Sequence, residues 1–144
     1  MTIAEILKGK GDQVVSVSPG DNAASIARTL AQYRIGAVLV RGSGGEVLGI
    51  VSERDIVRAF ASHGEELPRM TAEALMTRNL TTVTPCTAVL EALGTMTDRR
   101  IRHLPVMVEE RLAGMVSIGD LVKARIGEVE YEAESLRTYV ATGG

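Results

Sequence analysis

Aromatic residues are scarce in this sequence. Only 3% of the 144 residues are Phe, Trp or Tyr, and Trp is missing altogether. Proteins that bind single-stranded nucleic acid stack bases on several exposed aromatic rings, so this composition argues against that class. The 16 basic and 18 acidic residues give a net charge of −2. No overall positive field therefore attracts DNA or an anionic membrane, and we expect neither as a partner.

Cysteine and long apolar runs are also in short supply. Cys86 is the only cysteine, which excludes a disulfide within the chain and a Cys-rich metal site and fits a reducing compartment. His63 and His103 do not have the spacing of metal ligands, so no metal is expected. The first apolar run contains Glu5, which is unlike a signal peptide, and no uncharged run approaches the ~20 residues of a membrane span. We therefore expect a cytoplasmic protein.

The sequence contains an internal repeat. A shift of 66 residues lays 14–30 over 80–96, and after the loss of one residue "GIVSERDIV" (49–57) lies over "GMVSIGDLV" (114–122). Each copy reads as β-α-β-β-α and has only about 46 residues, too few to bury a core alone. The repeat therefore predicts an α/β fold of the α+β type, in which two copies pack sheet against sheet with pseudo-two-fold symmetry.

Hydrophobic periodicity and turn residues place the elements of each copy. A strand at 14–17 ends at Pro19, and Asp21 or Asn22 caps a helix with an apolar stripe. A hairpin and a second helix follow in both copies. The hairpin strands are expected at 37–40 with 46–51 and at 104–108 with 112–116, and the second helices from Asp55 and from Asp120.

The copies also set the domain organisation. "AEIL" (4–7) resembles "AEAL" (72–75), so a short helix is expected to open each copy, and Thr71 is a suitable N-cap for the second. We expect repeat one at about residues 1–62, repeat two at about 70–126, and a connector at 61–79. Residues 127–144 are expected to form a C-terminal helix and tail outside the repeats.

The C-terminal segment has a heptad pattern. Its apolar residues alternate at spacings of three and four over two heptads, which is typical of a coiled-coil seam. This helix either packs on its own domain or pairs with a second copy of the chain. The residues of the pattern are Ile126, Val129, Ala133, Leu136 and Val140.

Both copies place Ser and Asp three residues apart where a strand gives way to a helix. Ser52 with Asp55, and Ser117 with Asp120, are ordinary helix-capping residues. The same arrangement can also bind a nucleotide. A helix N-terminus attracts anions, a hydroxyl there can donate to a phosphate, and a carboxylate one turn further on can accept from two ribose hydroxyls. Both interpretations remain open at this point.

The paired motifs resemble a known family. Two β-α-β-β-α copies with "GIVSERDIV", "GMVSIGDLV", "VSP", "VTP" and "IRHLPV" are similar to a tandem cystathionine-β-synthase (CBS) domain pair, or Bateman module, over residues 1 to about 126. The resemblance implies a standalone, non-catalytic regulatory module. It would bind AMP, ADP or ATP in clefts between the repeats, signal energy state to an unknown protein partner, and associate as a homodimer.

The resemblance also implies particular site residues. Ser52 and Arg54 would meet phosphate and Asp55 the ribose in one site, where small Gly36 and Ala37 admit the adenine. In the other site Gly119 stands where the first has Arg54. The positive charge there would come instead from Arg102 and His103, which align with Gly36 and Ala37 of the first repeat. The residues implied there are Ser117, Asp120, Arg102 and His103, and the segments leading into the first strands add Lys10 and Thr77.

Other functions remain as alternatives. An NAD(H)-binding redox sensor would use the same residues, and a nucleic-acid-binding module would use the basic side chains around Arg102. A purely structural dimerisation module would use neither. No catalytic triad, P-loop or paired-carboxylate motif occurs in the sequence, so we do not expect an enzyme.

Overall fold

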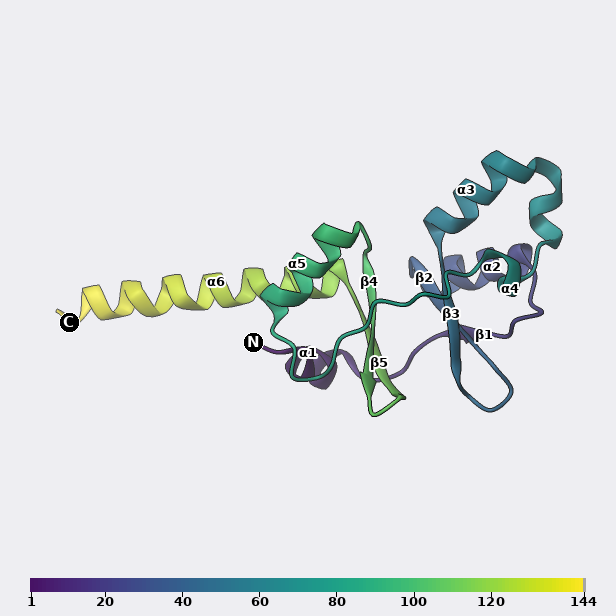
Figure 1. The fold of residues 1–144 in the computed structure, drawn as a ribbon. Coiled ribbons are helices and arrows are strands. Elements are labelled where there is room, and N and C mark those ends of the chain that lie inside the picture. Colours follow the sequence, from purple (N-terminus) through teal and green to yellow (C-terminus); the bar gives the residue numbers. More distant parts are fainter. Residues whose placement is uncertain (144) are drawn as a thin grey trace. The chain divides into compact units, whose positions relative to one another are not determined.

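The computed structural model describes residues 1–143, which form two compact units. The central unit is Gln13–Thr81, and the terminal unit combines Met1–Asp12 with the chain from Thr82 onward. Each unit has one small sheet and its own helices (Figure 1). The mixed α/β fold with two similar halves, predicted from the repeat, is confirmed.

The central unit is built on a three-stranded sheet. Strand β1 (Ser16–Val17) lies parallel to β2 (Ala37–Arg41), which forms an antiparallel hairpin with β3 (Val47–Ser52). The helices are α2 (Ala23–Tyr33), α3 (Glu53–His63) and α4 (Ala72–Leu75), with a 3₁₀ helix η1 (Gly64–Arg69) before α4. The predicted caps are confirmed, because the Asn22 and Thr71 side chains accept from the N–H groups of Ser25 and Ala74. The core is made of Val17, Ile26, Leu30, Val38, Val40, Val51, Ala72 and Met76.

The terminal unit repeats this plan with a shorter sheet. Strands β4 (His103–Val108) and β5 (Arg111–Ser117) are antiparallel, and a single parallel bridge from Val83 to Val106 stands where the other unit has β1. The helices are α1 (Ile3–Lys10), α5 (Val89–Arg99) and α6 (Ile118–Ala141). The core is made of Ile3, Val83, Val89, Ala92, Met96, Leu104, Val106, Val116 and Leu121.

The short opening helices pack with the other copy of the repeat. The N–H groups of Ile3 and Ala4 donate to the carbonyls of Thr87 and Pro85, both at 2.9 Å, so α1 completes the terminal unit. In the central unit, Ala72 and Glu73 make the equivalent bonds to Asp21 and Pro19. The sequence repeats and the compact units are therefore different segments. Helix α1, which the sequence places in repeat one, belongs spatially with repeat two.

The C-terminal helix is longer than expected. The helix predicted to begin at Asp120 and the separate one at 127–140 are a single helix, α6, of 24 residues. The predicted boundary near residue 126 therefore falls inside a continuous helix, and Gly144 lies outside the described residues. Leu121 is the only buried residue of α6, and the helix continues beyond the ends of α5 and α1 (Figure 1). The heptad stripe is not packed on its own unit, so that alternative is wrong.

Candidate functional site

The first Ser-x-x-Asp motif forms a capping box at the start of α3. The Ser52 N–H donates to Asp55 Oδ2 at 2.8 Å, and the Asp55 N–H donates to Ser52 Oγ at 3.3 Å. The Ser52 hydroxyl also donates to Asp55 Oδ2, at 3.0 Å. Each residue thus satisfies an N–H group that the helix start leaves without a helical partner. The capping interpretation of this motif is confirmed.

The second motif forms the same box at the start of α6 and adds an ion pair. The Ser117 N–H donates to Asp120 Oδ2 at 2.8 Å, and the Asp120 N–H donates to Ser117 Oγ at 3.2 Å. The Lys10 ammonium, from the end of α1, donates to the same Oδ2 at 2.6 Å and to the Met115 carbonyl at 2.8 Å. Lys10 therefore holds the carboxylate that the resemblance assigns to the ribose.

The charge state of Asp120 follows from these contacts. Partial burial raises the pKa of the Asp120 carboxyl, but hydrogen bonds from Lys10 and from the Ser117 N–H, with the charge of Lys10, outweigh it and leave the pKa below its usual range. Asp120 is thus an anion whose charge is neutralised within the terminal unit.

The residues just before each hairpin occupy matching positions. Ala37 pairs with Ser52 across β2 and β3, and His103 pairs with Ser117 across β4 and β5. The residue before each also matches, because the Gly36 carbonyl accepts from the first N–H of α3 at 2.9 Å, and the Arg102 carbonyl accepts from that of α6 at 2.8 Å. The structure therefore brings Gly36 and Ala37, and equally Arg102 and His103, beside the motif in their own units.

Arg54 has no counterpart in the terminal unit. It is the second residue of α3, and the equivalent residue of α6 is Gly119. At the junction of the terminal unit the basic residues are instead Arg102, just before β4, His103, the first residue of β4, and Lys10 at the end of α1. The two junctions share their backbone geometry and differ in where their cations stand.

Lys10 and Thr77, which the resemblance adds to the sites, reach equivalent strand residues by different groups. In the central unit, the Thr77 N–H donates to the Ile50 carbonyl at 2.9 Å, and the Ile50 N–H donates back to Thr77 at 3.1 Å. Met115 is the repeat equivalent of Ile50, and its carbonyl accepts from the Lys10 side chain instead. The terminal unit therefore makes this hydrogen bond to the strand carbonyl with the Lys10 ammonium, whereas the central unit makes it with a backbone N–H group.

The glycine that opens each motif lies against a close neighbour. A Cβ on Gly49 would lie 2.7 Å from Met76 Sδ and 2.8 Å from the Thr77 carbonyl oxygen. A Cβ on Gly114 would lie 2.8 Å from Leu7 Cδ2. The segment carrying Thr77 can thus approach β3 because that strand carries glycine at the crossing, whereas the neighbour of Gly114 is the flexible end of the Leu7 side chain.

A groove of about 500 Å³ beside the first motif was not predicted from the sequence. It lies between α2 and α3, is mainly apolar, and has Gly36 and Glu53 in its wall. A volume of this size is typical of small-ligand sites. The sequence feature that could have indicated the groove is Gly36, a small residue between the end of the first predicted helix and the strand that follows it. The lining residues are Ala27, Leu30, Ala31, Arg34, Ile35, Gly36, Glu53, Ile56 and Val57.

Neither a metal-binding cluster nor a membrane-spanning helix is present among the described residues. Among residues 1–143, no group of three or more His, Cys, Asp or Glu side chains could hold a metal ion. Over the same residues, no helix combines the length and the apolar character needed to cross a membrane.

The duplicated fold and its paired motifs define a tandem-repeat α/β module, and comparison with known proteins places it in a family. The CBS domain model matches residues 3–62 and 72–127. The chain therefore belongs to the CBS domain family, and its two copies form a CBS pair, which is a regulatory module.

Individual relatives agree with this assignment. The mitochondrial CBS domain-containing protein CBSX3 of Arabidopsis thaliana is 35% identical over 150 residues, which cover 99% of this chain and 73% of that protein. A CBS-domain protein from Agrobacterium tumefaciens has a crystal structure with a TM-score of 0.85 and 40% identity, covering 86% of this chain and 92% of its own. The CBS pair of protein MJ0100 shares the fold at 22% identity, with a TM-score of 0.74 over 89% of this chain and 98% of its own.

Proposed function

We propose that this protein is a non-catalytic regulatory module that binds an adenosine nucleotide, AMP, ADP or ATP, at each of its two Ser-x-x-Asp junctions. The observation that carries the proposal is the duplication itself. Both units place a hydroxyl, a carboxylate and a helix N-terminus together, and both bring a small or basic residue beside them across the hairpin. Capping uses only the Ser and Asp residues, so the small or basic residues beside each motif have no part in it.

The chemistry of the junctions suits a nucleotide. The start of α3 and the start of α6 each present a partial positive charge for phosphate, with Ser52 or Ser117 as hydroxyl donor. Asp55 and Asp120 would accept from ribose hydroxyls. The CBS pair of MJ0100 was solved with 5′-methylthioadenosine and S-adenosyl-L-methionine, both of which contain an adenosine. That likeness is one of fold, so it supports the ligand class and not a particular ligand.

The two sites are proposed to be unequal. In the central unit, Arg54 would meet the phosphates beside Ser52. In the terminal unit, Arg102 and His103 would do so, and a ribose at Asp120 has to share the carboxylate with the Lys10 ammonium, which already lies 2.6 Å away. We therefore expect the central site to bind neutral adenosine more tightly than the terminal site.

Calorimetric titration of ligand-stripped protein tests the proposal. AMP, ADP, ATP, NAD(H) and the matching guanosine nucleotides are compared, and heat is expected with the adenosine compounds and less with the guanosine ones. Binding of NAD(H) without AMP would support a redox sensor instead. An absence of heat with every adenosine compound would contradict the proposal and leave a structural dimerisation module.

A further inference from the structure

Helix α6 carries an exposed apolar stripe along its outer part. We call the five heptad residues Ile126, Val129, Ala133, Leu136 and Val140 the α6 stripe. Its four larger side chains are 47–69% exposed, and exposure is greatest at Leu136 and Val140, near the end of the helix. Spaced three and four apart, the five lie on one side of the helix. A solvent-facing stripe of this kind is expected to be covered by a partner.

The residue types of the α6 stripe favour a two-stranded pair. Ile126, Ala133 and Val140 occupy the first position of successive heptads, and Val129 and Leu136 the fourth. β-branched residues at the first position with Leu at the fourth favour parallel dimers. Ile126 and Val140 with Leu136 follow this preference, and Ala133 and Val129 do not add to it. The three residues that follow it match a second copy of the same helix, pointing the same way.

The charges beside the α6 stripe decide the orientation. In a parallel, in-register pair each residue at the seventh heptad position faces the residue five positions further along the partner. Arg125 would then face Glu130, and Glu132 would face Arg137, so that all four contacts of the dimer are attractive. In an antiparallel pair residues at the seventh position face each other, so the register that brings the two Glu132 side chains together has a repulsive contact at its centre. Arg125 and Arg137 now make pairs of 3.9 and 3.3 Å within their own helix, to Glu128 and Glu134.

We propose that two copies of this protein associate through the α6 stripe as a parallel, in-register coiled coil. The α6 stripe of one chain packs against the α6 stripe of the second chain. The proposal does not depend on nucleotide binding, because the α6 stripe lies beyond the capping box of Ser117 and Asp120.

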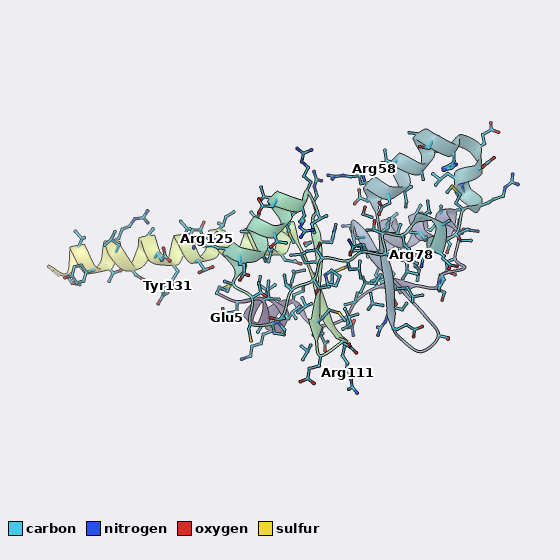
Figure 2. The ribbon with its side chains drawn as sticks, in the orientation of Figure 1. Glu5, Arg58, Arg78, Arg111, Arg125 and Tyr131 are labelled. Atoms are coloured by element: carbon cyan, nitrogen blue, oxygen red, sulfur yellow. The ribbon has the colours of Figure 1, made fainter. Side chains whose placement is uncertain are left out.

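Cysteine cross-linking of the full chain gives the first test. Cys86 is exposed and is replaced by Ser beforehand. Ile126→Cys and Val140→Cys, each alone, are expected to form disulfide-linked dimers under mild oxidation. Tyr131→Cys is the control, because Tyr131, labelled on α6 in Figure 2, is 75% exposed. It precedes Ala133 by two residues, which corresponds to about 200° round an α-helix and places it away from the stripe. Dimers that appear only when the Ile126→Cys and Val140→Cys proteins are mixed would show antiparallel pairing and overturn the proposal.

Charge reversal gives the second test, read by light scattering. Glu132→Arg and Arg137→Glu are each expected to raise the dimer dissociation constant about five- to tenfold, and the double variant to return it toward wild type. Ser135→Arg adds a positive charge on α6 at a heptad position that does not face the partner, and it should have little effect. If the double variant is no tighter than the single ones, or if the wild type is a monomer with no cross-link at either position, the proposal is wrong.

Discussion

Replacement of Lys10 by Met should destabilise the terminal unit in a way that depends on the charge of Asp120. Lys10 Nζ lies 2.6 Å from Asp120 Oδ2 and also bonds to the Met115 carbonyl, so a single side chain ties the end of α1 to β5 and α6. Methionine keeps most of the aliphatic length and loses the ammonium. The loss can therefore be attributed to the ion pair and its hydrogen bonds.

The magnitude follows from the exposure of the pair. The Lys10 side chain is 37% exposed and that of Asp120 26%, so water screens the interaction. An exposed pair contributes about 0.2–1 kcal/mol, and the fixed geometry with a second bond places Lys10 near the upper end. For a chain of this size, about 1 kcal/mol corresponds to a fall in melting temperature of roughly 2–4 °C.

The sign of the pH dependence is fixed by the lowered pKa of Asp120. A carboxyl whose pKa is lower in the folded state contributes stability that is present above its ordinary pKa of 3.8, and this stability is lost as the pH falls through the folded value. The difference between wild type and Lys10→Met should therefore be full at about pH 7 and shrink once the pH falls below about 4.

Thermal unfolding at a fixed protein concentration measures the effect, with Lys8→Met as the matched control. Lys8 is an exposed cation in the same last turn of α1, so both substitutions remove one charge from that helix end. Asp120→Asn completes a double-mutant cycle and keeps an oxygen for the capping box. The reasoning fails if Lys10→Met and Lys8→Met behave alike at neutral pH, or if the Lys10→Met difference is the same in acid.

Two further predictions concern the central unit. Arg54→Met should weaken ATP binding more than AMP binding and leave adenosine unchanged, because Arg54 is proposed to act on phosphate charge; equal losses for all three ligands in calorimetry would contradict this. Gly49→Ala should lower the free energy of unfolding by about 1–3 kcal/mol in chemical denaturation, because the new Cβ meets Met76 and the Thr77 backbone. Gly94→Ala, where a Cβ in helix α5 has open space, should instead be neutral or stabilising, and a loss at Gly94 as large as that at Gly49 would refute the packing argument.

Local signals predicted the elements that depend on local physics. The helix caps at Asn22 and Thr71 and the two hairpins follow from capping chemistry and strand alternation, which act within a few residues. The matching of Ala37 with His103 came from the repeat alignment, because duplicated sequences preserve register.

Contacts between segments that lie far apart in the sequence could not be predicted from such local signals. The similarity of residues 4–7 and 72–75 shows that the two short helices are equivalent, but not that each packs with the other copy. The contact between Lys10 and Asp120 joins residues 110 positions apart and has no spacing signal. The continuity of α6 could have been predicted from the sequence, because no proline interrupts residues 118–141.

Titration of the Asp55→Ala, Asp120→Ala double variant with AMP, beside wild type, tests the proposed nucleotide sites most directly. Loss of one charge-assisted hydrogen bond at each site is expected to weaken binding about ten- to a hundredfold, and each single variant should lose tight binding at its own site only. 2′-Deoxy-AMP should show part of this loss on wild type and little further loss on the double variant. If the folded double variant binds AMP as wild type does, Asp55 and Asp120 are helix caps and nothing more.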